Sequence, residues 1–284
     1  MGVTFNPLGG PLTGTLTTVA VIDTTRSCII KRPSNLSPPE AASLPLVFLT
    51  AVTTLSPPYF HLPLSHSTST STESKKPTVV ILGGSSGVGI YAIQYAVLSL
   101  SLNVITTCSP RNASFVRSLG VSQVIDYTSE SVPDRLKELR PKEGYIGIID
   151  CVGGTELFSS SSSSWETLLH PKNEDLKYGG SYVTIVGDKT SRDKMGGSLT
   201  NWFYPKQFWR IWRNYLFGWG HPYNCIMMDM NKDWLEKIEE LVREKGMKVV
   251  IDEEFGFEDV PKAFKKLNTG RARGKIVVNM NASE

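Results

Sequence analysis

Cysteine is scarce in this chain of 284 residues, and the four that occur stand far apart, at Cys28, Cys108, Cys151 and Cys225. None forms a CxxC pair, which argues against a zinc ribbon or a disulfide scaffold, and reduced thiols favour a cytoplasmic compartment. The first residues also lack a basic segment followed by an apolar one, so no secretory signal is expected. A mitochondrial location stays open.

Strong charge of one sign is absent as well. The formal net charge is +3, and the sequence contains no run of five or more Lys or Arg. Nucleic acid is therefore not an expected partner. The length, together with a hydrophobic content of 40%, fits a globular protein of one large domain or two smaller ones.

Charge is missing altogether from Thr78 to Pro110, which raises the question of a membrane-spanning helix. Glycines at four positions between 83 and 89 interrupt this stretch. The apolar segment after them, Val88–Leu102, has about 15 residues, short of the roughly 20 that a spanning helix requires. A buried β-α-β unit explains the same composition better.

Strand-like and helix-like segments alternate through the middle of the chain. The strand-like segments are Val79–Leu82, Val104–Thr107, Val124–Asp126, Tyr145–Asp150 and Tyr182–Val186. The helix-like segments are Val88–Leu100, Ala113–Leu119 and Ser131–Leu139. This alternation predicts a parallel sheet with right-handed crossovers.

The two ends of the chain carry shorter signals. TTVAVID (17–23) and SCIIKRP (27–33) are rich in strand-forming residues, and Ser37 with Glu40 forms a capping-box pattern that predicts a helix start. An apolar stripe that begins at Trp234 predicts an amphipathic helix. It is followed by the strand-like KVVID, a short helix over 260–267 and the strand-like GKIVVNM.

Two serine-rich stretches, at 65–77 and 159–164, are polar and of low complexity. We interpret both as surface loops inserted between the regular elements.

The glycine cluster stands directly after a predicted strand and opens a predicted helix. Small residues let the chain turn sharply there, and the helix N-terminus adds a partial positive charge of about half a unit, so the turn suits a phosphate. From Gly84 the motif is G-S-S-G-V-G, with Ser86 at the second glycine position of the dinucleotide-binding pattern. Ser86 is small and can donate a hydrogen bond to a phosphate. A glycine-rich turn without a ligand is the plainer alternative.

The next predicted strand refines the expected ligand. A NAD-binding unit usually places Asp or Glu about 20 residues after its first glycine, on the ribose 2′-hydroxyl. No acidic residue occurs here between Glu73 and Asp126, and the strand is followed by Ser109 and Arg111. Arg suits a 2′-phosphate through its charge and planar donors, so the sequence favours NADP(H) over NAD(H). Arg111 as an ordinary surface residue is the alternative.

Several stretches resemble the medium-chain dehydrogenase/reductase superfamily, in its zinc-independent quinone oxidoreductase or enoyl-reductase-like branch. These stretches follow that superfamily's order along most of residues 14–284. They are PEAASLPLVFLTAVTTL, VVILGGSSGVGIYAIQYA, SLGVSQVIDYTSE, GIIDCVGG, GGSYVTIVGD and GRARGKIVV.

The resemblance implies an α/β fold, a Rossmann doubly wound parallel sheet with a reduced GroES-like β catalytic remnant. It assigns residues 1–45 to that remnant, 46–248 to the NADP(H)-binding domain and 249–284 to a C-terminal return. Family members carry a long additional segment before the equivalent of Gly14, so the catalytic domain is expected to be shortened here and no catalytic residue is assigned. No zinc or other metal is expected.

The cofactor-binding residues combine the motif and the resemblance. The motif and the strand after it contribute Gly84, Ser85, Ser86, Gly87, Val88, Gly89, Ser109 and Arg111. The resemblance adds Thr50 of the linking helix, Tyr127 near the 2′-phosphate, Cys151, Val152 and Gly153 beside the riboses, Val186 and Gly187 near the nicotinamide, and Lys275 of the C-terminal strand.

The resemblance implies hydride transfer from NADPH to a small-molecule acceptor, a quinone or an α,β-unsaturated carbonyl. Because the catalytic part is expected to be short, a catalytically impaired nucleotide-binding or interaction protein is the main alternative. A serine hydrolase is a minor one, since Gly83–Gly87 also reads G-x-S-x-G with Ser85 as nucleophile and His170 or His221 available later. Neither Gly-Lys-Ser/Thr nor Tyr-x-x-x-Lys occurs where a P-loop or a short-chain dehydrogenase needs it.

The segment 201–223 holds ten aromatic residues together with Lys206, Arg210 and Arg213. It predicts a helix packed on the core or at an interface of a homo-oligomer. A peripheral membrane contact is the alternative, because Trp, Tyr and Arg suit the headgroup region.

Overall fold

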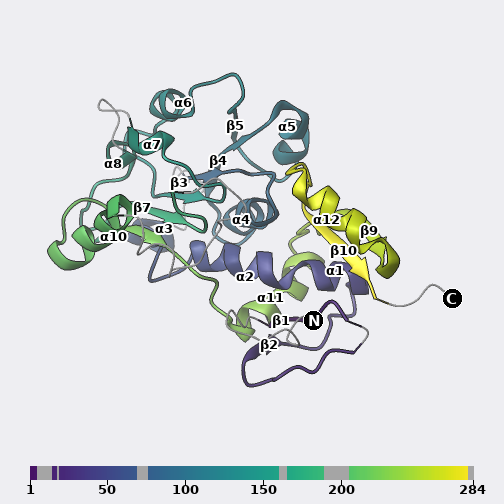
Figure 1. Ribbon diagram of the computed structural model, residues 1–284. Helices are drawn as coiled ribbons and strands as arrows, with labels where there is room; N and C mark the ends of the chain where they lie inside the picture. Colours follow the sequence, from purple (N-terminus) through teal and green to yellow (C-terminus); the bar gives the residue numbers. More distant parts are fainter. Residues whose placement is uncertain (5–14, 18, 69–75, 160–164, 189–204, 281–284) are drawn as a thin grey trace. The chain divides into compact units, whose positions relative to one another are not determined.

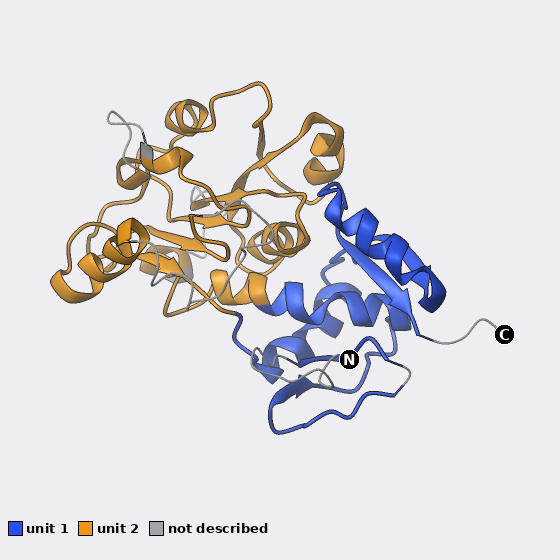
Figure 2. Cartoon of the chain, viewed as in Figure 1, with its two compact units in different colours: residues 1–49, 228–284 blue, residues 50–227 orange. Residues whose placement is uncertain are grey.

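The computed structural model describes residues 1–4, 15–17, 19–68, 76–159, 165–188 and 205–280. The chain divides into two compact units, a larger one of residues 50–227 and a smaller one of residues 1–49 with 228–284 (Figure 2). Helix α2 (Pro45–Thr54) carries the chain from the smaller unit into the larger one.

The larger unit is built on a six-stranded sheet in which every neighbouring pair is parallel. Its strands are β3 (Thr78–Leu82), β4 (Asn103–Cys108), β5 (Gln123–Asp126), β6 (Gly147–Asp150), β7 (Ser181–Thr184) and β8 (Tyr223–Cys225). All residues of β3, β6 and β7 are buried, as expected for a parallel sheet that is covered on both faces.

The strand order is β5-β4-β3-β6-β7-β8. The chain therefore starts in the middle at β3, moves outward through β4 to β5, and returns to β6 on the other side of β3. This is the doubly wound order of dinucleotide-binding folds, and it confirms the predicted α/β class. The reversal between β3 and β6 creates the point at which ligands bind in such sheets.

Helices flank the sheet along the connections between strands (Figure 1). They are α4 (Gly87–Leu98), α5 (Pro110–Arg117), α6 (Val132–Glu138), α7 (Glu156–Ser159), α8 (Trp165–Leu168) and α10 (Pro205–Phe217). The short helix α3 (Leu64–Thr68) precedes β3 in the chain. Helix α4 packs against β3 and β4, while α10 packs against β8. Buried side chains of the strands join Leu136, Leu157 and Trp165 in one apolar core.

The smaller unit contains two two-stranded sheets. Strands β1 (Gly2–Thr4) and β2 (Ser27–Ile29) are antiparallel, whereas β9 (Ile251–Gly256) and β10 (Lys275–Asn279) are parallel. Its helices are α1 (Pro38–Ser43), α11 (Lys232–Arg243), the 3₁₀ turn η2 (Phe257–Asp259) and α12 (Val260–Asn268). Helix α12 packs on both β9 and β10, which it connects.

Several sequence predictions at the ends of elements need correction. The stretch 17–23 forms no strand in its described residues, because Val19 and Val21 are 78% and 100% exposed and gain nothing from a pleated surface. The predicted capping box of Ser37 and Glu40 is confirmed at the start of α1, and Pro45 then starts a second helix, α2. Strand β8 has no counterpart among the predicted segments.

The serine-rich stretches are only partly described. Residues 65–68 belong to the short helix α3 and residue 159 ends α7, whereas 69–75 and 160–164 lie outside the described residues. Across the described part of the chain, no helix has the length and apolar character needed to span a membrane.

Candidate functional site

Five loops that carry predicted site residues leave the same edge of the sheet. Because the strands are parallel, the segments after β3, β4, β5, β6 and β7 all follow carboxyl ends. They are Gly83–Ser86, Ser109, Tyr127, Cys151–Gly153 and Val186–Gly187. The topology thus brings together most of the predicted positions at the switch point, where a crevice is expected.

The turn after β3 closes tightly on the neighbouring strand and helix. The N–H of Gly83 donates to Thr107 Oγ1 at 2.8 Å, and the N–H of Gly84 donates to the Thr107 carbonyl at 2.9 Å. Gly83 has a φ of +80°, a conformation that favours glycine. A Cβ atom on Gly84 would stand 2.2 Å from Thr106 Oγ1, so packing against β4 also requires a small residue there.

Ser86 caps helix α4. Its Oγ accepts a hydrogen bond from the N–H of Gly89 at 3.0 Å, which satisfies one donor of the first helical turn. A hydrogen bond from Ser86 also lowers the pKa of the Cys151 thiol, against the larger opposing effect of burial. The structure therefore gives Ser86 a capping role that the sequence analysis did not assign.

The loops after β4 and β5 lie beside the glycine turn in strand order. Ser85 Oγ accepts a hydrogen bond from Asn112 Nδ2 at 3.1 Å, which ties the turn to the first residues of α5. Arg111 is the neighbour of Asn112 in that helical turn and is exposed, and Ser109 is its N-cap residue. Tyr127 follows β5 and is 57% exposed.

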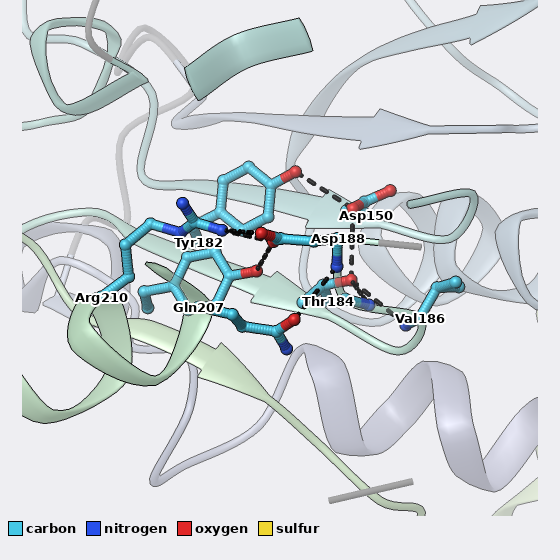
Figure 3. A network of polar contacts seen from close by, with 9 residues as sticks. Asp150, Tyr182, Thr184, Val186, Asp188, Gln207 and Arg210 are labelled. Carbon is cyan, nitrogen blue, oxygen red and sulfur yellow. Dashed lines mark hydrogen bonds and ion pairs between the residues drawn. The ribbon is translucent and has the colours of Figure 1, made fainter. Parts of the chain in front are cut away.

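The loop after β6 is organised by Asp150, a residue that the sequence analysis did not single out. Asp150 Oδ1 accepts from the N–H groups of Val152 at 3.0 Å and Gly153 at 2.8 Å. Asp150 Oδ2 accepts from the hydroxyls of Tyr182 at 3.1 Å and Thr184 at 3.2 Å (Figure 3). The only signal in the sequence was an acid at the end of an otherwise apolar strand.

The loop after β7 continues this polar network. Thr184 Oγ1 accepts from the N–H groups of Val186 at 3.2 Å and Gly187 at 2.9 Å. Asp188 then donates its N–H to Gln207 Oε1 at 3.2 Å and pairs through its carboxylate with Arg210 of α10 (Figure 3). The loop is therefore held from the sheet on one side and from α10 on the other.

Burial controls the protonation of these groups. Desolvation raises the pKa of Asp150, although the four hydrogen bonds from Val152, Gly153, Tyr182 and Thr184 act in the opposite direction. Desolvation also raises the pKa of the Cys151 thiol, and the charge of Asp150 adds to this effect. Cys151 is therefore a neutral thiol at physiological pH and unsuited to act as a thiolate nucleophile.

Thr50 and Lys275 belong neither to these loops nor to helices α4 and α5, which directly follow two of them. Thr50 is buried within α2, at 9% exposure. Lys275 begins β10 in the smaller unit, where desolvation lowers the pKa of its ammonium group.

The hydrolase arrangement does not form in this structure. All four histidines of the chain contact residues that precede the strands, at the amino edge of the sheet, whereas Ser85 lies at the carboxyl edge. His66 bonds to the Leu100 carbonyl and His221 to the Gly180 carbonyl, both at the starts of strands. His170 lies beside Tyr145 before β6, and the His61 ring lies 4.7 Å from that of Tyr178 before β7.

Within the described ranges, no three or more His, Cys, Asp or Glu side chains are arranged to hold a metal ion.

A cavity of about 240 Å³ lies away from the switch point. It is lined by residues before β3 and β6, including Lys76, Glu143 and His170, and so belongs to the amino edge of the sheet. The predicted binding residues do not line it, so we do not identify it with the cofactor site.

The aromatic segment forms helix α10 from residue 205, and residues 201–204 fall outside the described ranges. Arg210 and Arg213 are turned inward and paired with Asp188 and Glu166, at 12% and 22% side-chain exposure. Large apolar side chains around the end of the helix are instead exposed: Trp209, Tyr215, Leu216, Phe217 and Trp219.

Comparison with known proteins gives a consistent set of similarities. A family profile described as zinc-binding dehydrogenase matches residues 119–278. The human mitochondrial NAD(P)H oxidoreductase RTN4IP1 is 32% identical over 276 residues, which cover 94% of this chain and 61% of that protein. The trans-enoyl reductase pgmF of Aspergillus terreus is 32% identical over 206 residues, 72% of this chain and 51% of that protein.

Among solved structures, the quinone oxidoreductase from Coxiella burnetii superposes with a TM-score of 0.61 at 25% identity. The match covers 89% of this chain and 64% of that structure. The chain thus spans less than two thirds of each of the three proteins.

Proposed function

The chain belongs to the medium-chain dehydrogenase/reductase superfamily, in its quinone oxidoreductase and enoyl-reductase-like branch, and from this we propose that it is an NADPH-dependent oxidoreductase. We propose as its acceptor a quinone or an α,β-unsaturated carbonyl compound. The cofactor supplies the hydride, and the residues of this chain bind and orient it.

The observation that carries the proposal is the glycine turn at the switch point of the sheet. The first N–H groups of a helix have no partner within the helix. In α4, Ser86 Oγ satisfies the N–H of Gly89, and the N–H groups of Gly87 and Val88 are the helix-start donors that we assign to the pyrophosphate. We assign the loop after β7 to the nicotinamide, and the loop after β6, which the family resemblance sets beside both riboses, to the ribose of the nicotinamide half.

The preference for NADPH over NADH rests on the residues after β4 and β5. Where a NAD-binding unit places a ribose-binding acid, at the end of the second strand, this chain has Cys108 and Ser109. Exposed Arg111 and Tyr127 follow adjacent strands at the same edge. A guanidinium there supplies charge and planar donors to a 2′-phosphate.

A calorimetric titration with NADPH and NADH tests this assignment directly. Wild type should bind NADPH more tightly than NADH. Arg111→Ala should lose about 10- to 100-fold in NADPH affinity, since a hydrogen bond to a charged group contributes about 1.5–3 kcal/mol, and should leave NADH affinity unchanged. Arg117→Ala, an exposed arginine of the same helix, is the matched control. Equal losses for both nucleotides would contradict a 2′-phosphate role.

The second candidate function is a nucleotide-binding protein without turnover. This candidate is kept because the described residues at the carboxyl edge supply hydrogen-bond donors to a nucleotide, and we assign none of them as a general acid. A steady-state assay of NADPH oxidation with quinones and α,β-unsaturated ketones separates the two candidates. Turnover with either acceptor class supports the oxidoreductase, and tight NADPH binding without turnover supports the binder.

We further propose that activity does not require zinc, because the two buried carboxylates at the carboxyl edge, Asp150 and Asp188, are already engaged by hydrogen bonds and by the ion pair with Arg210. The predicted domain boundaries, 46–248 for the cofactor domain, are kept as a proposal beside the compact unit of residues 50–227.

The sequence favours the cytoplasm, whereas the human relative RTN4IP1 is named as a mitochondrial protein. Localisation of the tagged chain by microscopy distinguishes these.

The exposed aromatic residues of α10 are proposed to contact either a second copy of the chain or a membrane surface. Sedimentation of the protein alone tests for association with a second copy, and co-sedimentation with anionic vesicles tests for binding to a membrane surface.

A further inference from the structure

The carboxylate of Asp150 is almost completely removed from solvent, at 1% exposure, in the middle of the candidate site. An isolated charge is costly in such a place, and a buried carboxyl group persists only where donors compensate it. Four donors do so here: two backbone N–H groups of the loop after β6 and two hydroxyls of β7. The Asp150 carboxylate therefore connects the loop after β6 to the neighbouring strand β7.

Thr184 transmits this link to the second loop. Its hydroxyl donates to Asp150 Oδ2 at 3.2 Å, and its oxygen accepts from the N–H groups of Val186 at 3.2 Å and Gly187 at 2.9 Å (Figure 3). The Thr184 hydroxyl thus donates its proton to Asp150 and at the same time holds two backbone N–H groups of the loop after β7 in place. Gly187 has a φ of +81°, so the loop is held in a turn that few residues adopt.

We propose that Asp150 and Thr184 are positioning residues that preset the loops Cys151–Gly153 and Val186–Gly187 for the nicotinamide half of the cofactor. The inference rests on the proposed function, because that function assigns the two loops to the nicotinamide. It also separates two parts of the site. Binding of the adenosine half of the cofactor depends on the loops after β3, β4 and β5, whereas binding of the nicotinamide half depends on the buried network of Asp150 and Thr184.

The directions of the hydrogen bonds support a positioning role over a purely packing one. Asp150 and Thr184 accept hydrogen bonds from backbone N–H groups of the two loops. Removing these acceptors should therefore alter the conformation of the loops more than the packing of the core. Thr184 contacts neither the glycine turn nor the loops after β4 and β5 through any hydrogen bond found in the described residues. A change at Thr184 therefore acts first on the loop after β7, and it reaches the glycine turn only indirectly, through Asp150 and the loop after β6.

The test compares Thr184→Val with Thr184→Ser by calorimetry. The valine variant keeps the shape and loses the hydroxyl, whereas serine keeps the hydroxyl. The ligands are NADPH and adenosine 2′,5′-bisphosphate, which lacks the nicotinamide half. Thr184→Val should weaken NADPH binding about 10-fold or more, because two N–H groups and a carboxylate lose a partner, and should change binding of the bisphosphate less than about twofold. Thr184→Ser should restore NADPH binding.

Each outcome decides a different point. Unchanged NADPH affinity in Thr184→Val, or equal losses for both ligands, overturns the inference while the proposed function stands. If wild type binds neither ligand, the proposed function fails and the inference fails with it. If Thr184→Val does not fold, Tyr182→Phe takes its place: it removes one donor to Asp150, and it must weaken NADPH binding selectively for the inference to survive.

Discussion

A single methyl group decides whether the turn after β3 can close against the start of α4. A Cβ atom on residue 89 would lie 2.2 Å from the carbonyl oxygen of Gly83 and 2.9 Å from Ser86 Oγ. The first of these atoms belongs to the backbone of the turn and cannot rotate away. Gly89 is therefore the residue that lets the helix approach the strand closely, which is the role expected of the third glycine in a dinucleotide-binding turn.

Gly89→Ala should accordingly lower both stability and cofactor affinity. Overpacking of this kind costs about 1–3 kcal/mol, and the shifted turn should move the N–H groups assigned to the pyrophosphate. Chemical unfolding and NADPH titration measure the two effects. Gly256→Ala is the control, since a Cβ atom there meets nothing within 4 Å and the expected change is below about 0.5 kcal/mol. A Gly89→Ala variant as stable as wild type would contradict the packing argument.

At the scale of an element, α10 is fixed to the site through one face. Gln207 is buried and accepts the N–H of Asp188, while Arg210 pairs with the carboxylate of Asp188. The guanidinium also lies 4.2 Å from the centre of the Phe158 ring in α7. The helix therefore supports the loop after β7 and leaves its aromatic end exposed.

Arg210→Met should destabilise the protein by about 3 kcal/mol, because it leaves the carboxylate of Asp188 buried with one charged partner removed. Lys206→Met, an exposed change on the same helix, should stay within about 0.5 kcal/mol of wild type. The difference in urea unfolding midpoints between the two variants, multiplied by the m-value, measures the cost of removing the guanidinium from Asp188. Similar midpoints would show that α10 is held by its apolar contacts instead.

At the scale of the whole molecule, the polar groups described at the carboxyl edge of the sheet are mainly backbone N–H groups and hydroxyls. No group suited to a metal ion occurs among the residues described. The matched family is described as zinc-binding dehydrogenase, so whether this chain binds zinc can be measured directly.

Prolonged dialysis against a chelator should leave the thermal midpoint and the NADPH affinity of the full chain unchanged. NADPH at about 100 times its Kd should instead stabilise the protein by about 2.7 kcal/mol, because it binds the folded state. Thermal unfolding with and without each treatment, and metal analysis of the purified protein, measure both. Stoichiometric zinc, or a fall in midpoint after chelation, would contradict the expectation.

The sequence by itself determined the class of the fold and the place of its central motif. Alternating strand and helix patterns predicted the parallel sheet, and the glycine cluster after a buried strand predicted the turn and the helix that follows it. Such signals are local: they depend on periodicity, on the conformational freedom of glycine and on caps such as Ser37 with Glu40, all within a few residues.

Only the tertiary structure decided which distant residues act together. Asp150 and Thr184 belong to strands 30 or more residues apart in the chain, and their hydrogen bond depends on the pairing of β6 with β7. The same pairing explains why an acid ends an apolar strand. His170 and His221, which the sequence left available to Ser85, lie at the opposite edge of the sheet, because the starts and the ends of parallel strands lie at opposite edges.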